Sequence, residues 1–466
     1  MSIINLNLKD LLEFLTHHSC CSVMYLAFFC MCLVVVLILL CFVMNKRSSC
    51  KVYLKDFACY KPPPSQKCSK ELLMKQVRRM GYIPEEMLDF MKIIMEGCGL
   101  GDSTYLPEIF FKESYNPSMK NSRREVEMAI FGSVDMLLAK TDVKSEDIGI
   151  LIVNCCIYNP VPSLSSIVIN HYKLRENIIS YNLSGMGCSA GLVAIGLAKQ
   201  LLQVHHNSYA LIVSTESITG NCYVGKDRSK FFINCLFRAG GAAILLSNRP
   251  SDHKHSKYQL VHTIHTNTST SDQCYHSIFR EEDNAGIVGV TINKHLVATA
   301  IATIERNIIT LGYLILPMQE KVVYIARKLL PSKTLSLNNI PNFRKAIDHF
   351  LPHVGGKVVL DQLQKTLGFS EDNMEASRMT LFRYGNTSSS SIWYELAYVE
   401  AKGRVKRGNR VWQMAFGSGF KCQSVIWRAI KTVDHDDYNP WADEIVGFPV
   451  ILEDIETDPF SFVPSK

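Results

Sequence analysis

The sequence predicts an α/β layered fold in which helices cover mixed sheets. Short apolar runs typical of buried strands alternate with stretches of helical apolar spacing, and this alternation recurs in both halves of the chain. With 466 residues, 47% of them hydrophobic, and only 26 Gly and 17 Pro, the chain can bury a large core. That composition excludes a disordered, collagen-like or disulfide-dense protein, and the length corresponds to roughly two to four domain-sized units.

In the first half of the chain, apolar runs predict buried strands and two segments predict helices. The strands are expected at 148–153, 210–213 and 242–246. Apolar residues keep helical spacing over 126–140, directly after Ser122-Arg-Arg-Glu125, which predicts a capping box at the start of that helix. Residues 190–202 are apolar nearly all round, which indicates a helix buried between two layers.

The second half repeats this pattern, although sequence identity alone does not show an internal repeat. Helices are expected at 343–350, 358–367 and 392–402, and a strand at 410–416. Gly368 and Gly403 follow the second and third of these helices, where a glycine typically ends a helix.

An N-terminal apolar segment predicts one transmembrane helix. Residues 23–44 contain no charge, and at about 1.5 Å per residue they would cross roughly 30 Å of hydrocarbon. A cleaved signal peptide would have a shorter apolar region and a small-residue cleavage site. Lys46, Arg47 and further lysines follow the span, so we expect the rest of the chain in the cytosol. Residues 1–22 form a leader, and 45–100 a basic connector that wraps the body.

Charge and cysteine usage narrow the classes of ligand. The net charge of +7 is spread thinly, which favours anionic ligands or a membrane surface over a nucleic-acid partner. The sixteen cysteines form no CxxC pair and no Cys/His ligand spacing, so we expect no structural zinc and no other metal. They are typical of reduced thiols in a protein that faces the cytosol.

Cys188 is the strongest candidate nucleophile. It follows a glycine-rich turn, Asn182-Leu-Ser-Gly-Met-Gly, and comes directly before the apolar segment 190–202. The N–H groups at the start of a helix lower the pKa of a thiol, so this position predicts a stabilised thiolate. The alternative is a small buried hydrophobic side chain at a tight turn.

Two later segments carry partners for such a nucleophile. His349 and His353 are four residues apart, and Gly355-Gly356 follows the second histidine, so that a ligand could approach closely. Asn386 begins a serine-rich turn before the predicted helix 392–402. As alternatives, His349 is a structural histidine and Asn386 an ordinary turn residue. Together, a thiolate, an imidazole and an amide suit thioester chemistry. Papain-like hydrolases share the order Cys, His, Asn, but those proteins are usually secreted and disulfide-bonded.

Several blocks, in order, resemble one enzyme family. They are YNLSGMGCSAG, VNCCIYNPVPSLSSIVINHY, DRSKFFINCLFRAGGAAILLSN, TLGYLILPMQEK, AIDHFLPHVGGKVVLDQL and FRYGNTSSSSIWYELAYVEAKGR. From about residue 54 to its end, the chain resembles the plant membrane-bound 3-ketoacyl-CoA synthases, relatives of chalcone synthase in the thiolase-fold superfamily. The resemblance implies a thiolase-like layered fold of two similar halves, 101–260 with the nucleophile and 261–466 with the histidine and asparagine.

The resemblance also implies an acyltransferase that elongates very-long-chain fatty acids. Cys188 would accept an acyl group from a long-chain acyl-CoA, and His353 and Asn386 would hold malonyl-CoA while it loses carbon dioxide. His349 stays a further candidate. No cofactor is implied. The expected setting is a homodimer in the endoplasmic reticulum membrane, working beside reductases and a dehydratase in very-long-chain lipid and wax or cuticle synthesis.

Two positions depart from the family pattern. Asn267 and Phe382 stand where the family usually has histidines. Phenylalanine neither donates a hydrogen bond nor titrates near neutral pH. These departures leave open a catalytically weak homologue that pairs with or regulates active synthases. A third alternative, polyketide condensation on aromatic starters, is disfavoured by the predicted span.

Overall fold

A computed structural model describes residues 28–38, 50–322 and 342–452 in two units, 1–50 and 51–466. In the first unit the described residues form an exposed apolar helix, Phe28–Ile38. The predicted leader and the rest of the predicted span lie outside the described residues. Among the described residues, one stretch, Gly187–Val204, is long and apolar enough to cross a membrane. It packs against strands of the second unit, which accounts for its apolar composition.

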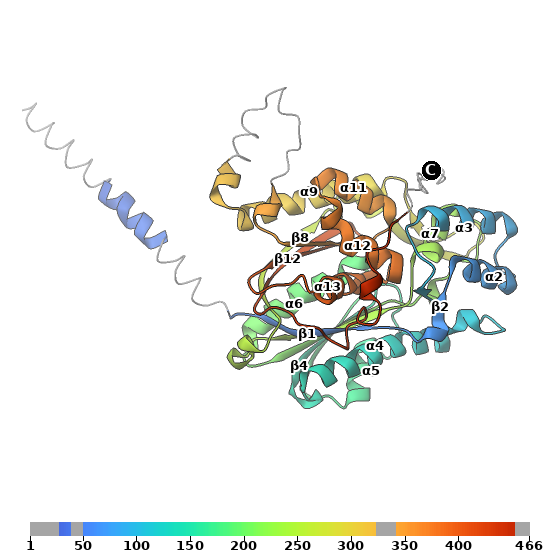
Figure 1. The fold of residues 1–466 in the computed structure, drawn as a ribbon, viewed down its shortest axis with the longest axis horizontal. Helices are drawn as coiled ribbons and strands as arrows, with labels where there is room; N and C mark the ends of the chain where they lie inside the picture. Colours follow the sequence, from blue (N-terminus) through green and yellow to red (C-terminus); the bar gives the residue numbers. More distant parts are fainter. Residues whose placement is uncertain (1–27, 39–49, 323–341, 453–466) are drawn as a thin grey trace, which may run out of the picture. The chain divides into compact units, whose positions relative to one another are not determined.

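The second unit is built on a large sheet covered by helices (Figure 1), and the order of its nine strands shows a duplication. The strands are β1 (Tyr53–Tyr60), β4 (Ile148–Asn154), β5 (Ile179–Leu183), β6 (Tyr209–Thr215), β7 (Gly241–Ser247), β8 (Tyr258–Asn267), β11 (His349–Pro352), β12 (Arg410–Gly417) and β13 (Lys421–Ala429). The first half runs β4-β6-β7-β1 and the second β11-β12-β13-β8, and in each half the first pair is parallel and the next two antiparallel. Edge strand β5 extends the first half.

Within the sheet, the two halves are joined by a short pairing between β1 and β8. β1 pairs with β8 through two residue pairs, Tyr53 with Gln259 and Leu54 with Tyr258. Each half then continues with its own strand order, and the chain makes the crossing once, between β7 and β8. Two similar halves, as the family resemblance implies, are therefore visible in the topology although sequence identity does not reveal them.

Helices form three layers around the two half-sheets. They are α2 (Lys70–Met80), α3 (Glu85–Gly97), α4 (Met119–Thr141), α5 (Leu164–Tyr172), α6 (Ala190–Val204), α7 (Arg228–Leu236), α8 (Asp272–Tyr275), α9 (Leu296–Ile315), α11 (Lys357–Leu367), α12 (Glu371–Tyr384) and α13 (Ser391–Ala401). The central core joins α6 and α13 to the inner faces of both half-sheets, and α4 with α5 covers the outer face of the first (Figure 1). The third core packs α9 and α11 with α2, α3 and α7.

The predicted strands at 148–153, 210–213 and 242–246 are confirmed as β4, β6 and β7. The predicted helices at 190–202, 358–367 and 392–402 and the strand at 410–416 are confirmed as well. Gly368 ends α11 with φ +62°, and Gly403 follows α13 with φ +63°. Both glycines adopt the left-handed conformation that ends helices.

The predicted capping box at Ser122 is wrong. The capping residue of α4 is Ser118, four residues earlier, and its hydroxyl accepts the N–H of Asn121. Glu125 lies nearly two turns inside the helix, where its carboxylate accepts the N–H groups of Ile218 and Thr219 at 2.7 and 2.9 Å. A more distant loop thus uses the acceptor that the local motif assigned to the helix start.

Two further expectations need correction. Residues 343–350 form a short turn, Phe343–Lys345, and then the start of β11, because Phe350 pairs with Trp412 of β12. A short apolar run does not distinguish a helix from a buried strand by spacing alone. The predicted connector 45–100 contributes β1, which lies in the middle of the sheet, and α2 and α3, so from residue 51 on it belongs to the body.

Candidate active site

A cavity of about 500 Å³ brings three of the predicted site residues together. Cys188, His353 and Asn386 all line it. Each comes from a different element: a turn after β5, the end of β11, and the turn between α12 and α13. The volume falls in the ordinary range for small-molecule sites. The fold thus assembles a thiol, an imidazole and an amide that are up to about 200 positions apart in sequence.

The Cys188 turn is shaped by close contact with the β12–β13 hairpin. Cys188 sits in a single turn, Gly187–Ser189, that leads into α6. A side chain at Gly417 would place its Cβ 2.7 Å from the carbonyl oxygen of Met186 and 2.8 Å from the amide nitrogen of Cys188. Gly187, at φ +60°, would likewise meet the amide nitrogen of Ser418 at 2.6 Å. Glycine is required at these positions because backbone packs on backbone.

The thiol of Cys188 is protonated at rest, which corrects the prediction of a stabilised thiolate. Burial, together with the Glu216 carboxylate, raises the pKa of Cys188 to about 12, although hydrogen bonds from Ser388, Asn386 and its own amide act in the opposite direction. α6 begins only at Ala190, after the turn that holds the cysteine. The field of the helix start is therefore outweighed by desolvation of the charged form.

His353 is a neutral imidazole with both ring nitrogens available. The side chain is 1% exposed, and burial lowers its pKa to about 3. Within the described part of the chain, neither Nδ1 nor Nε2 has a hydrogen-bond partner. The backbone is fixed, since the His353 N–H donates to the carbonyl of Met414 at 2.8 Å and the ring packs edge-on against Phe416. Buried nitrogens without a partner are costly for stability, and this cost is typical of a catalytic group that waits for its substrate.

Asn386 is oriented by its neighbours so that its amide NH₂ faces the cysteine. Its Oδ1 accepts the N–H of Ser388 at 2.8 Å, and its side chain hydrogen-bonds Cys188. The backbone bonds Leu236 and Arg238 at 3.1 and 2.9 Å, tying the turn to the end of α7. Ser388 has φ +59°, an uncommon conformation for a residue with a side chain, and its hydroxyl lies 3.8 Å from the sulfur of Cys188.

His349 does not belong to this group of residues. It starts β11, its Nε2 lies 3.3 Å from Oδ1 of Asn409, and it does not line the cavity. Along a strand, four residues span about 13 Å. The expected helical spacing that would have placed His349 beside His353 is absent, since the segment is a strand.

The two departures from the family pattern also lie outside the cavity wall. Asn267 ends β8, and its Oδ1 accepts the N–H of Ser269 at 3.0 Å. Phe382 is on α12, where its ring covers Gly101 and packs near Phe448. Neither residue faces the reacting groups, so these substitutions leave the arrangement of Cys188, His353 and Asn386 intact.

Sequence reasoning missed two groups beside the thiol. Glu216 is 5% exposed, and its carboxylate accepts the N–H groups of Cys156 and Ile157 at 2.9 and 3.2 Å. The sulfur of Cys156 accepts the N–H of Gly187 at 3.1 Å, next to the nucleophile. Both residues follow the carboxyl ends of the neighbouring parallel strands β6 and β4. Ligands gather at such ends, so this rule could have found them.

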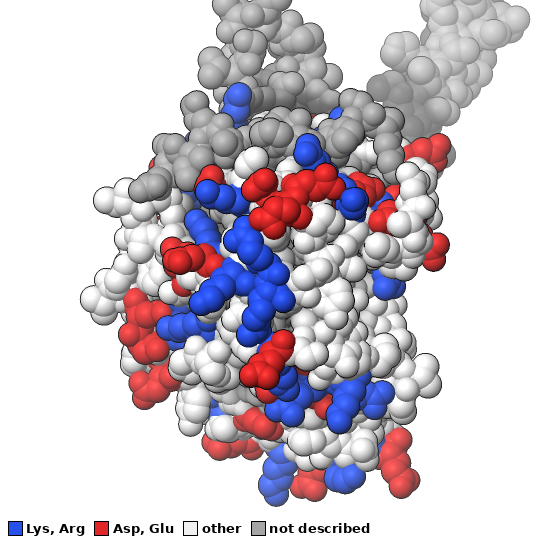
Figure 2. All heavy atoms as spheres, turned by 90° about the vertical axis from the view of Figure 1, so that its right-hand side faces the viewer, with Lys and Arg blue, Asp and Glu red and all other residues white. Residues whose placement is uncertain are grey.

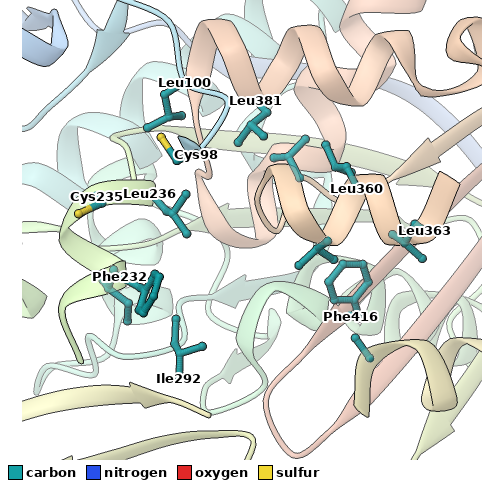
Figure 3. Packing of buried hydrophobic residues seen from close by; sticks show 14 of the residues in the cluster. Cys98, Leu100, Phe232, Cys235, Leu236, Ile292, Leu360, Leu363, Leu381 and Phe416 are labelled. Carbon is teal, nitrogen blue, oxygen red and sulfur yellow. The ribbon is translucent and has the colours of Figure 1, made fainter. Parts of the chain in front are cut away.

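The rest of the cavity is an apolar wall. Leu236, Ile292 and Phe416 border the same space in Figure 3, and all three line the cavity. Its basic residues are Arg280, which is exposed, and Lys421, whose ammonium donates to the carbonyl of Ser418 at 3.2 Å. Among the described residues no group of three His, Cys, Asp or Glu side chains could hold a metal ion. The site therefore offers nucleophilic and hydrogen-bonding chemistry beside an apolar chamber.

The chemistry that this arrangement supports is acyl transfer. A neutral thiol and a neutral imidazole can exchange a proton as the sulfur attacks a thioester. The amide of Asn386 and the imidazole can then donate to an oxygen on which charge develops.

Comparisons with known proteins agree with this chemistry. Residues 43–334 match the family described as FAE1/Type III polyketide synthase-like protein, and 343–429 match the 3-oxoacyl-[acyl-carrier-protein] synthase III C-terminal family. The chain is 52% identical to 3-ketoacyl-CoA synthase 11 of Arabidopsis thaliana, covering 92% of this chain and 84% of that protein. It is 46% identical to 3-ketoacyl-CoA synthase 8 of the same plant, covering 96% and 94%.

Solved structures share the fold at lower identity. The polyketide synthase PKS-I of the brown alga Ectocarpus siliculosus gives a TM-score of 0.62 at 18% identity, covering 82% of this chain and 98% of that one. The 1,3,6,8-tetrahydroxynaphthalene synthase of Streptomyces coelicolor A3(2) gives 0.63 at 19%, covering 81% and 99%. These likenesses establish the mixed α/β architecture of type III polyketide synthases.

Proposed function

The chain belongs to the FAE1/type III polyketide synthase-like family, and we propose that it is a 3-ketoacyl-CoA synthase of very-long-chain fatty acid elongation. It condenses malonyl-CoA with a long-chain acyl-CoA, releasing carbon dioxide and free CoA. The observation that carries this proposal is the meeting of Cys188, His353 and Asn386 in one apolar cavity.

The first step is transfer of the acyl group to Cys188. The sulfur attacks the thioester carbonyl of the acyl-CoA while His353 accepts the thiol proton. The proton then passes to the leaving CoA sulfur. Because burial holds both groups neutral, a proton is separated only while substrate occupies the cavity, where neighbouring donors stabilise the charge.

The second step is decarboxylative condensation. The thioester oxygen of malonyl-CoA accepts hydrogen bonds from His353 and the Asn386 amide, and these donors stabilise the enolate left when carbon dioxide departs. The enolate carbon attacks the acyl thioester on Cys188 and forms a carbon–carbon bond as the carbon–sulfur bond breaks. The cysteine leaves as thiolate and takes up a proton from solvent water, which balances the proton consumed in the decarboxylation. The product is a 3-ketoacyl-CoA two carbons longer. No cofactor takes part in these steps.

Charge and shape suit these substrates. A CoA thioester carries several negative phosphate charges, and Figure 2 shows Lys and Arg side chains gathered in a band on one face of the molecule. The cavity wall is apolar, which matches an aliphatic chain.

The cellular setting extends the proposal. The uncharged run 23–44 would hold the enzyme in the endoplasmic reticulum membrane with its catalytic part in the cytosol, beside the reductases and dehydratase of elongation.

A homodimer would continue the sheet at edge strand β5, where Tyr181 is exposed. The catalytic halves would be 101–260 and 261–466, completed by β1.

The deciding experiment is product analysis in a host that lacks very-long-chain fatty acids. The full-length chain should produce new, longer acyl chains, and Cys188→Ala, matched for membrane expression, should produce none. New chains that persist in Cys188→Ala would overturn the assigned nucleophile. A wild-type chain without product would favour the catalytically weak homologue. Asn267→His with Phe382→His would then test whether those two departures are responsible.

A further inference from the structure

A short hairpin, separate from the main sheet among the strands that the structure describes, forms one wall of the cavity. In that part of the chain, β9 (Ile278–Glu282) and β10 (Val288–Ile292) form ladder pairs only with each other. We call residues 278–292 the roof hairpin. The hairpin contributes five residues to the cavity lining: Ile278, Phe279, Arg280, Val290 and Ile292. An isolated two-stranded hairpin is marginally stable, so its position depends on what it packs against.

The roof hairpin rests on α7, and a buried lysine holds the two together. Ile233 and Leu236 of α7 line the cavity, and Lys230 lies one turn before Ile233 on the same helix. Lys230 is 1% exposed. Its ammonium contacts Asp227 of its own helix end at 3.0 Å, Glu281 of β9 at 3.2 Å and Thr291 of β10 at 2.6 Å. All three N–H donors are used, and one side chain reaches both strands of the hairpin.

Two further contacts show that the hairpin is fitted to this lysine. A side chain at Gly289 would place its Cβ 2.8 Å from Cδ of Lys230 and 2.8 Å from the ring of Tyr223. Glycine at this position lets the β10 backbone lie directly on the aliphatic part of the lysine. The Tyr223 hydroxyl donates to Asp283, at the turn of the hairpin. In the adjoining core, Figure 3 shows Ile292 of the hairpin near Phe232 of α7.

We propose that Lys230 is a positioning residue for the acyl substrate: by holding the roof hairpin on α7, it keeps the apolar wall along which the acyl chain lies. The inference rests on the proposed function and assigns the acyl chain to one side of the cavity. A preformed wall spares the enzyme the ordering of a loose hairpin each time an acyl chain binds. A buried ammonium with two carboxylates and a hydroxyl fixes the geometry, since each charge needs its partner.

The test compares three variants of the full-length enzyme in detergent. Lys230→Met keeps the length of the side chain and removes the ammonium, while Lys230→Arg keeps a cation that can reach the same carboxylates. Lys226→Met is the matched control, because Lys226 is exposed in the same segment and its ammonium pairs with the exposed Glu86 at 3.5 Å. The Michaelis constant is measured for icosanoyl-CoA, for hexanoyl-CoA and for malonyl-CoA.

For Lys230→Met we expect the KM for icosanoyl-CoA to rise about tenfold, with kcat and the KM for malonyl-CoA changed by less than about twofold. The effect on hexanoyl-CoA should be small, because a short chain makes few contacts with the hairpin. Lys230→Arg should recover most of the affinity. Equal KM values for Lys230→Met and Lys226→Met would overturn the proposal. An equal loss of kcat for every substrate would also overturn it, since it indicates a purely structural lysine.

Amide hydrogen exchange separates this inference from the proposed function. In Lys230→Met the amides of 278–292 should exchange at least about tenfold faster than in Lys226→Met, while β4 and β6 stay protected. If the amide exchange rates of the roof hairpin are unchanged in Lys230→Met, Lys230 does not hold the hairpin, even if the enzyme is active. If the wild-type enzyme condenses no acyl-CoA, the proposed function fails, and the exchange comparison still decides whether Lys230 holds the hairpin.

Discussion

The turns that precede α6 and α13 occupy equivalent places in the two halves of the fold but have different chemistry. In the first half the turn is Gly187–Ser189, and in the second it is Ser388–Ser390. By topology Cys188 corresponds to Ser389. Cys188 lines the cavity, whereas the hydroxyl of Ser389 is buried and donates to Oδ1 of Asn154 at 2.7 Å. The duplicated turn supplies the nucleophile in one half and a structural anchor in the other.

The difference shows how a duplicated fold builds an asymmetric site. The two turns contact each other through the Ser388 hydroxyl and the Cys188 sulfur, 3.8 Å apart, and a Cβ at Gly191 in α6 would lie 2.6 Å from the carbonyl oxygen of Ser389. The Ser389 hydroxyl ties the second turn to β4, while the Ser388 N–H bonded to Oδ1 of Asn386 orients the asparagine itself. The first turn can therefore present the reactive Cys188 thiol against a second turn, Ser388–Ser390, that is held in place by its own contacts.

The largest effect is expected for Asn386→Ala, which tests whether the two turns have separate roles in the reaction. It removes one donor to the developing enolate, so malonyl-CoA decarboxylation should fall by about 10²–10³-fold. Acylation of Cys188 by acyl-CoA, followed by intact-protein mass, should persist because the first turn is unchanged. Asn386→Asp serves as a control of similar size without the NH₂ donor, and an equal loss of acylation in both variants would show that the turns do not divide the work.

The contact between the turns can be broken with Gly191→Ala. The added methyl would meet the Ser389 carbonyl oxygen and push the sulfur away from Asn386, so condensation should fall about 10²-fold, as a misplacement of about 1 Å can cause. Gly196→Ala on the same helix is the control, because its nearest neighbour is the flexible end of Gln423 at 3.2 Å. Similar activities of the two variants would contradict a close functional contact.

Because the Cys188 thiol is protonated at rest, its rate of alkylation should depend on pH. With a pKa near 12, the thiolate fraction rises about tenfold per pH unit across the range where the protein is folded. Alkylation of Cys188 by iodoacetamide, quantified on its own peptide, should therefore increase steadily from pH 6 to pH 10 (about 10⁴-fold). A rate that reaches a plateau near neutral pH would instead indicate a thiolate stabilised by the start of α6.

The smallest effect on catalysis is expected for Ser389→Ala. Loss of the hydroxyl leaves Oδ1 of Asn154 buried without that donor, which should lower the free energy of unfolding by about 1–3 kcal/mol. Activity per folded molecule should change by less than about threefold. Ser389→Cys should still give a single acyl adduct per chain by intact mass, and a second adduct would show that the two turns remain chemically interchangeable.

The fold was predictable where uninterrupted apolar runs dominate, and less so where tertiary contacts decide. β4, β6 and β7 follow from short apolar runs and α6 from a longer one, because run length favours a buried strand in the first case and a buried helix in the second. β11 was predicted as a helix, since its four residues gain their conformation from pairing with β12. β1 was assigned to a connector because its strand partners lie about 190 residues further along the chain.

Part of the site was equally hidden in the sequence. Cys188, His353 and Asn386 stand at turns with distinctive glycine and serine patterns, which the sequence displays directly. Lys230 looks like an ordinary surface lysine, and only the folded hairpin reveals its burial. The pKa of Cys188 was misjudged because the helix start is local and visible, whereas the burial that outweighs it is created by other segments.

The position of β1 means that it is synthesised long before the strands with which it pairs. It is the first strand that the ribosome releases, yet Tyr53 pairs with Ser247 and Gln259. At about 5–20 residues per second, β1 waits roughly 10–40 s for these partners. During that interval its apolar side chains are exposed and both of its edges are open. A chaperone that binds the nascent chain would be needed most between the emergence of residue 60 and that of residue 260.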